Sequence, residues 1–305
     1  MQLGFVSGIF GDLGLEEVLA FAGAERFDCV EMMCWPRVAE DSRFGGVSHL
    51  DVGDFSPTRA DETLALCDKH GVQFSALGYY PNPLSADAEE AELARTHLRR
   101  VIDAAPLLGL GTVNTFIGAN TRATLEENLA EFARVWPDLV RYAEDRNVRL
   151  GIENCPMLFD HTWPSGANLA RSPVVWRRMF ETIPSQHFGL NLDPSHLVMQ
   201  LIDYLAPIRE FRDRLFHTHA KDMKIDRARL KEVGALSGPL SSGWGTPKIP
   251  GLGDIDWGQW VSALSDVDYH GPICIEVEDE AFTSSLDQRQ RSLRISRNVL
   301  APLIN

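Results

Sequence analysis

Short apolar runs alternate along this chain with longer segments whose apolar residues recur at helical spacing. The apolar runs predict buried strands at Leu3–Ser7, Asp28–Met33, Val72–Leu77 and Thr112–Ile117, and four more that begin at Arg149, His187, Leu215 and Pro272. Helical spacing predicts helices at Leu15–Ala24, Pro57–His70, Ala88–Leu108, Thr124–Arg146, Ser172–Thr182, Leu201–Arg214, Trp257–Val267 and Leu286–Leu300. Strands and helices therefore alternate along almost the whole chain.

Eight strand–helix units predict the α/β class and a closed (β/α)8 barrel, the TIM barrel, as a single domain over residues 1–305. A doubly wound open sheet is the runner-up, but about six strands usually suffice in that fold. Two loops are long for a compact domain, Trp35–Ser56 and Met223–Asp256. We expect the second, at about 223–256, to be a lid-like insertion that covers the barrel mouth.

Each of the last four strands carries a metal-binding type of side chain at or near its carboxyl end: Glu153, Asp193, His219 and Glu276. In a parallel barrel these ends open on one face, so the four side chains can converge on one ion. Three carboxylates and one imidazole suit a single divalent ion, for which we expect Mn²⁺, with Mg²⁺, Co²⁺ and Zn²⁺ as alternatives. Such an ion could polarise a carbonyl and stabilise an enediolate. A salt bridge at the barrel mouth is the alternative for Glu153 taken alone.

Other polar residues lie next to these positions in the sequence. We expect His196, in Asp-Pro-Ser-His, to contact a substrate, together with Lys221 and Asp222 at the end of the seventh strand. A solvated pair at the rim is the alternative for Lys221 and Asp222. Two more residues share strand parity with expected ligands and are expected to orient the metal-binding groups: His217 and Glu278.

Aromatic and amide side chains follow the early strands. Trp35, Tyr79, Tyr80 and Asn82 would suit the apolar face and the hydroxyls of a sugar, and we expect them at the substrate. Packing between helices and barrel is the alternative for the aromatic rings.

Composition narrows the function further. The 305 residues carry a formal net charge of −14, which disfavours nucleic acid and anionic membranes as partners. No apolar run approaches the roughly 18 residues of a membrane helix, and the first residues lack a signal-peptide pattern. The five cysteines are scattered and odd in number, which is typical of reduced thiols. We expect a cytoplasmic protein with a small-molecule substrate, and a homo-oligomer stays open.

An ordered set of motifs resembles the xylose isomerase-like TIM-barrel superfamily, in particular its sugar phosphate isomerase/epimerase branch, of the AP endonuclease family 2 type. The set is Gly151-Ile-Glu-Asn, Asn191-Leu-Asp-Pro-Ser-His, His217-Thr-His-Ala-Lys-Asp, Pro250-Gly-Leu-Gly-Asp-Ile-Asp-Trp and Ile275-Glu-Val-Glu. The resemblance spans nearly the whole chain. It implies a metal-dependent sugar isomerase or epimerase that acts by proton transfer through a metal-stabilised enediolate.

The resemblance also implies roles for single residues. Glu153, Asp193, His219 and Glu276 match the metal ligands of the ketose 3-epimerases. Glu153 and Glu276 there also act as the catalytic acid and base on opposite faces of the sugar. His196 matches a histidine that contacts the substrate.

Two departures leave the substrate open. The epimerases carry an arginine six residues after the metal-binding histidine, where this chain has Ile225, and the insertion after the seventh strand is long. A lyase or decarboxylase acting on oxidised (3-keto) sugars or glycosides is therefore the alternative. A nuclease of the endonuclease IV type is disfavoured because residues 72–78 and 112–118 contain no histidine. A non-catalytic sugar-binding barrel is disfavoured by the pair of glutamates.

Overall fold

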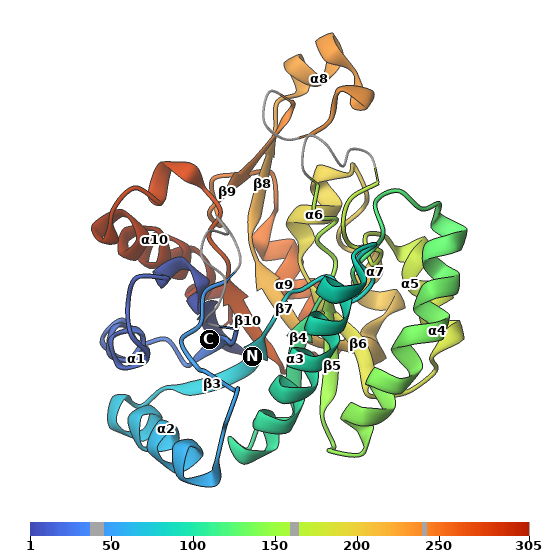
Figure 1. Ribbon diagram of the computed structural model, residues 1–305. Coiled ribbons are helices and arrows are strands. Elements are labelled where there is room, and N and C mark those ends of the chain that lie inside the picture. The colour runs from blue at the N-terminus through green and yellow to red at the C-terminus, as the bar shows by residue number, and fades with distance from the viewer. Residues whose placement is uncertain (37–45, 159–164, 240–242, 305) are drawn as a thin grey trace.

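A closed barrel of parallel strands forms the centre of the computed structural model, which describes residues 1–36, 46–158, 165–239 and 243–304. Its eight described strands follow one another around the barrel, and β1 pairs with β10 to close it (Figure 1). The strands are β1 Gln2–Val6, β2 Cys29–Met33, β3 Gln73–Gly78, β4 Thr112–Thr115, β5 Arg149–Glu153, β6 Phe188–Leu192, β7 Leu215–Ala220 and β10 Pro272–Ile275. The predicted (β/α)8 fold is confirmed.

Helices surround this barrel, except α8, which lies beyond it (Figure 1). They are α1 Leu15–Ala24, α2 Pro57–His70, α3 Ala88–Leu107, α4 Leu125–Glu144, α5 Pro173–Thr182, α6 Pro194–Met199, α7 Ala206–Glu210, α8 Arg227–Val233, α9 Trp257–Asp266 and α10 Leu286–Ile304. None of the described helices is long and apolar enough to cross a membrane.

Local sequence sets several of these boundaries. The Ser56 hydroxyl accepts the Arg59 N–H at the start of α2, and Gly71 ends that helix at a φ of 66°. Thr124 and Glu127 cap the start of α4 reciprocally. Large apolar side chains then fix the helices to the barrel; Trp136 of α4, for example, is fully buried and packs near Phe188 of β6.

The prediction of one helix at Leu201–Arg214 is wrong. Leu201 has a positive φ of 60°, and only Ala206–Glu210 forms an α-helix, followed by a 3-10 turn at Arg212–Arg214. The Asp203 carboxylate accepts the N–H groups of Leu205 and Ala206, so a new helix starts there. The short helix α6, Pro194–Met199, was not predicted and lies just before this segment.

The insertion after β7 is an arm built on an antiparallel hairpin of β8 Asp222–Ile225 and β9 Gly245–Lys248. Figure 1 shows α8 at the far end of this hairpin, beyond the barrel. Met223, Ile225 and Trp244 pack against Met199 of α6, which joins the hairpin to the barrel rim. The described residues of the insertion do not line the large cavity at the barrel mouth. The pairing of β8 with β9 directs the insertion away from the barrel. The length of the insertion alone did not predict this direction.

Candidate active site

Four side chains from four neighbouring strands meet at the carboxyl end of the barrel. One oxygen each of Glu153, Asp193 and Glu276 lies within 4.8 Å of the others and of a His196 nitrogen. Nδ1 of His219 lies 3.7 Å from Glu153 Oε1 and 3.4 Å from Glu276 Oε2. The structure therefore brings together the expected set of Glu153, Asp193, His219 and Glu276.

The donor set fits a divalent cation. Asp193 uses one oxygen to accept the Ser195 N–H at 2.7 Å, which starts α6, and this fixes its carboxylate at the strand end. Among the described residues, the buried Nδ1 of His219 has no hydrogen-bond partner, and the buried Oδ2 of Asp193 has only ionic contacts, with Lys221 at 3.3 Å and His196 at 3.4 Å. Buried polar atoms without hydrogen bonds are costly, and an ion bound by both atoms would compensate for this cost. Carboxylates and imidazole suit Mn²⁺ and similar metals.

A buried ammonium group lies beside these carboxylates. Lys221 Nζ is 2.7 Å from Glu276 Oε2, 3.1 Å from Glu278 Oε2 and 3.3 Å from Asp193 Oδ2. Burial alone would lower the pKa of Lys221, but the carboxylates outweigh it and hold the pKa well above its usual range. Lys221 therefore carries a positive charge at the site, and it reaches the expected position from the end of β7. Glu278, expected to orient a neighbouring group, contacts this ammonium.

His196 contacts two of the expected ligands. Its Nε2 lies 3.3 Å from Glu153 Oε1 and 3.4 Å from Asp193 Oδ2. Burial lowers the pKa of His196, but Cys155 and Asp193 raise it well above its usual range. The pKa of Glu153 is raised by burial and by Glu276, yet the neighbouring His196 and His219 bring it down to about 2. Glu153 is therefore ionised near neutral pH.

Glu31, on β2, belongs to this centre although the sequence analysis did not single it out. Its Oε2 lies 2.7 Å from His219 Nε2, and its Oε1 accepts the Tyr80 hydroxyl. Burial raises the pKa of Glu31, but His219 and His217 outweigh this and lower it. The available signal was a carboxylate in the middle of an otherwise apolar strand, which is rare without a partner.

His217 lies one layer deeper in the barrel, as its strand parity predicted. Its Nδ1 is 2.9 Å from Asn191 Oδ1, and its Nε2 is 3.0 Å from Ser75 Oγ. The Asn191 carboxamide also lies 3.0 Å from His219 Nε2. His217 thus orients the Asn191 carboxamide, which in turn contacts His219.

A cavity of about 660 Å³ opens above these residues. One wall is polar and includes Glu153, Lys221, Glu276 and Glu278. An apolar wall comes from the ends of β1 and β2 and from the segments that follow them: Val6, Ile9, Met33, Trp35 and Val47. The expected substrate residue Trp35 therefore lies at the cavity, and so does Tyr80.

Three residues that were expected to contact a substrate do not line this cavity: Tyr79, Asp222 and Asn82. Tyr79 packs between Trp35 and His97, behind the cavity wall, because successive strand side chains point to opposite faces. Asp222 is buried at the base of the arm, where it accepts hydrogen bonds from Gly251 N, Ile255 N and Trp257 Nε1. Its position immediately after Lys221 places it on the other side of the strand end.

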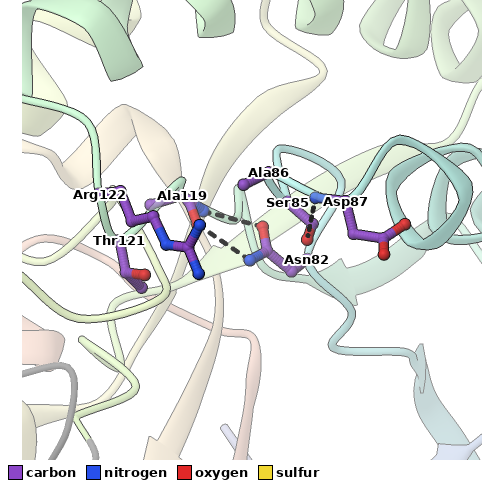
Figure 2. Close-up of a pocket in the computed structure, with 7 residues that line it drawn as sticks. All are labelled: Asn82, Ser85, Ala86, Asp87, Ala119, Thr121 and Arg122. Carbon is purple, nitrogen blue, oxygen red and sulfur yellow. Dashed lines mark hydrogen bonds between the residues drawn. The ribbon is translucent and has the colours of Figure 1, made fainter.

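Asn82 is the third of these residues. Its carboxamide oxygen accepts the Ala119 N–H and its NH₂ donates to the Ala119 carbonyl, both at 2.9 Å. Figure 2 shows this pair at the centre of a separate polar pocket, with Arg122 on one side and Asp87 on the other. Asn82 thus joins the loops that follow β3 and β4.

Comparison with known proteins agrees with this architecture. A model of the xylose isomerase-like TIM-barrel family matches residues 19–301. The chain belongs to this family. It is 25% identical over 306 residues to the uncharacterized protein YfiH of Bacillus subtilis, covering 92% of this chain and 93% of that protein. It is 24% identical to an inosose dehydratase of Clostridium tetani over 145 residues, 48% of each chain.

Solved structures share the fold at low sequence identity. D-psicose 3-epimerase of Clostridium cellulolyticum, solved with D-tagatose, matches with a TM-score of 0.71 at 12% identity, over 100% of both chains. An IolI protein with a bound zinc atom matches with a TM-score of 0.73 at 15% identity, over 100% of this chain and 98% of that one.

Proposed function

We propose that this protein is a divalent-metal-dependent sugar isomerase or epimerase that moves a proton at a carbon next to a carbonyl. The observation that carries the proposal is the convergence of Glu153 and Glu276 with Asp193 and His219 at one end of the cavity. Family membership and the similarity to D-psicose 3-epimerase support it.

The ligand set would be Glu153, Asp193, His219 and Glu276, and Mn²⁺ is the ion we propose. Bound there, the ion would polarise the substrate oxygens and so acidify the neighbouring C–H bond. Other residues would hold the substrate: Lys221 lines the cavity and could bind an oxygen, and so could His196, whose Nε2 lies 3.3 Å from Glu153 Oε1.

Glu153 and Glu276 would act as the base and the acid. They come from β5 and from the end of β10, which are separated around the barrel by β6 and β7. Carboxylates from different strands can therefore approach a bound sugar from different sides. The pKa of each is lowered by neighbouring groups, Glu153 by His196 and His219 and Glu276 by Lys221 and His219, so both start ionised. Either can accept the proton from carbon, and the carboxyl group formed in this way is the acid that returns it; protonation from the opposite face would need the other glutamate to take up a proton from water first.

Elimination of water from a sugar-derived ketone is the second candidate. It is supported by Lys221, an ammonium group 2.7 Å from Glu276 that can protonate a departing hydroxyl, and by the similarity to inosose dehydratases. The first step, removal of a proton next to a carbonyl, is common to both reactions. They differ in whether the carbon is reprotonated or a neighbouring hydroxyl leaves.

One experiment separates these reactions. The protein would be incubated with Mn²⁺ in D₂O and a panel of ketoses, 3-keto sugars and cyclic polyol ketones, and the products followed by NMR and mass spectrometry. An isomerase or epimerase incorporates deuterium into a product of unchanged composition, whereas a dehydratase releases one water.

Glu153→Gln and Glu276→Gln test the catalytic pair. An amide can still offer an oxygen to the ion but cannot take up the proton, so each variant should retain metal and lose at least about 10²-fold in deuterium exchange. Normal exchange in both variants, or no exchange by the wild-type protein with any substrate of the panel, would refute the proposal.

A further inference from the structure

We propose that Glu31 is a positioning residue that fixes the ring orientation and the tautomer of His219, so that Nδ1 is free to bind the divalent ion. The inference rests on the metal site of the proposed function. Its starting observation is the contact of 2.7 Å between Glu31 Oε2 and His219 Nε2, both of them fully buried.

The fold places Glu31 at this contact by specific means. The pairing of β2 with β3 shifts register between Val30 and Glu31, which leaves Ser75 as an extra residue on β3. Register shifts re-aim side chains and are common near active sites. Gly78 provides the space: a Cβ at this position would lie 2.6 Å from Glu31 Oε1. All residues of β2 are buried. The register shift therefore sets the direction of the Glu31 side chain, and Gly78 leaves space for its carboxylate.

The chemistry of the contact decides which nitrogen of His219 carries the proton. An ionised carboxylate only accepts hydrogen bonds, so the hydrogen must be on Nε2. The Tyr80 hydroxyl donates to the other oxygen of Glu31 and holds the carboxylate in place. Nδ1 faces Glu153 and Glu276 at 3.7 and 3.4 Å and has no hydrogen-bond partner among the described residues. The ion would therefore meet a lone pair on Nδ1.

A second metal ion is the competing use of this cluster, since Glu31, His217 and His219 offer ligand atoms within 4.8 Å of one another. The hydrogen bonds argue against it. Both nitrogens of His217 already contact Asn191 and Ser75, and both oxygens of Glu31 contact His219 and Tyr80. The polar atoms of Glu31 and His217 are therefore already hydrogen-bonded, and the cluster supports one expected ligand, His219.

The test compares Glu31→Gln with wild type in two measurements that need no substrate. Mn²⁺ affinity is measured from the EPR signal of the free ion, and the ¹⁵N shifts of His219 are measured in protein loaded with Zn²⁺. Loss of the carboxylate should weaken Mn²⁺ binding about 10–100-fold. It should also change the His219 Nε2 signal from that of an N–H bonded to a carboxylate.

Gly78→Ala is the second variant, because its Cβ displaces the Glu31 carboxylate without removing its charge. It should also weaken Mn²⁺ binding. Glu16→Gln, an exposed carboxylate next to Lys69, is the control and should bind as wild type does.

Unchanged affinity and unchanged His219 signals in folded Glu31→Gln or Gly78→Ala would overturn the inference, as would two bound ions per chain in wild type and one in Glu31→Gln. Loss of thermal stability without loss of affinity would show a purely structural role and would also overturn it. A wild-type protein that binds Mn²⁺ in this way but transforms no sugar would contradict only the proposed function.

Discussion

Lys221 neutralises much of the negative charge that gathers at the barrel mouth. The Lys221 side chain is 1% exposed, and its ammonium group contacts Asp193, Glu276 and Glu278. Removing one partner of a buried ion cluster leaves the others unpaired, which is far more costly than breaking a pair at the surface. In the absence of a metal ion, Lys221 therefore helps to keep these carboxylates together, alongside His196 and His219.

We predict that Lys221→Met lowers the free energy of unfolding of the metal-free protein by about 3 kcal/mol. Excess Mn²⁺ should restore part of this loss, because the ion supplies positive charge to the same carboxylates and binds only the folded state. Urea titrations with chelator and with Mn²⁺ measure both effects. Lys69→Met, at an exposed pair with Glu16, is the control and should be neutral. An equal loss with and without Mn²⁺ would contradict this account of Lys221.

The location of a single side chain could be predicted from the sequence where its position at a strand end determines it. Glu153, Asp193, His219 and Glu276 were expected together because they end neighbouring strands, and the structure brings them together. Their role as ligands stays a prediction. Glu31 could not be found in this way, because it lies within β2 and reaches His219 only through a register shift that the sequence does not reveal.

The arm after β7 has a fixed base and a projecting tip. At the base, the buried Asp222 carboxylate accepts hydrogen bonds from Gly251, Ile255 and Trp257. At the tip, α8 and the turn at Ala235–Ser237 contain no buried residue. Stability is therefore concentrated at the base.

We predict that replacing residues 227–237 with a short Gly-Ser turn lowers the free energy of unfolding by only about 1–2 kcal/mol, from the half-buried Leu230 and Val233. Asp222→Ala, the matched change at the base, should cost about 3 kcal/mol because it leaves several buried donors without an acceptor. A larger loss for the tip than for the base would contradict this division. Turnover of the tip variant tests the lid: a lid predicts a fall although the barrel stays folded.

Elements were predictable where their signals are local. The helices Leu15–Ala24 and Pro57–His70 were predicted with the bounds that the structure has, since spacing and caps mark them. The segment after β6 was not, because one aspartate cap and a positive φ at Leu201 break it into shorter pieces. The hairpin of β8 and β9 depends on pairing across a long insertion.

On the scale of the whole molecule, the barrel brings the first and the last strands together, and the cavity is lined by residues from both ends of the chain. The expected metal ligands Glu153 and Glu276 in its lining come from the second half of the chain, whereas Val6, Ile9, Met33 and Trp35 on the apolar wall come from its first residues. The fold was predictable because strand and helix patterns repeat. The cavity was not, because its shape depends on side chains that meet only when β1 pairs with β10.

The apolar wall leads us to predict a substrate that is larger than a free monosaccharide, with an apolar group attached to its sugar part. A free sugar offers hydroxyls to the polar end but little surface to Trp35, Ile9 and Met33, and a cavity of about 660 Å³ is in the range of sites for larger ligands. With Mn²⁺ present, an aryl glycoside of a 3-keto sugar, which keeps a carbonyl, should therefore bind more tightly than the corresponding free 3-keto sugar in isothermal titration calorimetry.

Trp35→Ala is the variant that locates this preference. Loss of the indole surface should weaken binding of the aryl glycoside about tenfold, which corresponds to about 1.4 kcal/mol of apolar contact, and should leave binding of the free sugar unchanged. Tyr79→Phe is the matched control, because Tyr79 packs behind Trp35 without lining the cavity, so both ligands should bind this variant as they bind wild type. If Trp35→Ala weakened both ligands equally, the indole would be contacting the sugar itself, as the sequence suggested. If wild type bound both ligands with the same affinity, the apolar wall would have no part in substrate selection.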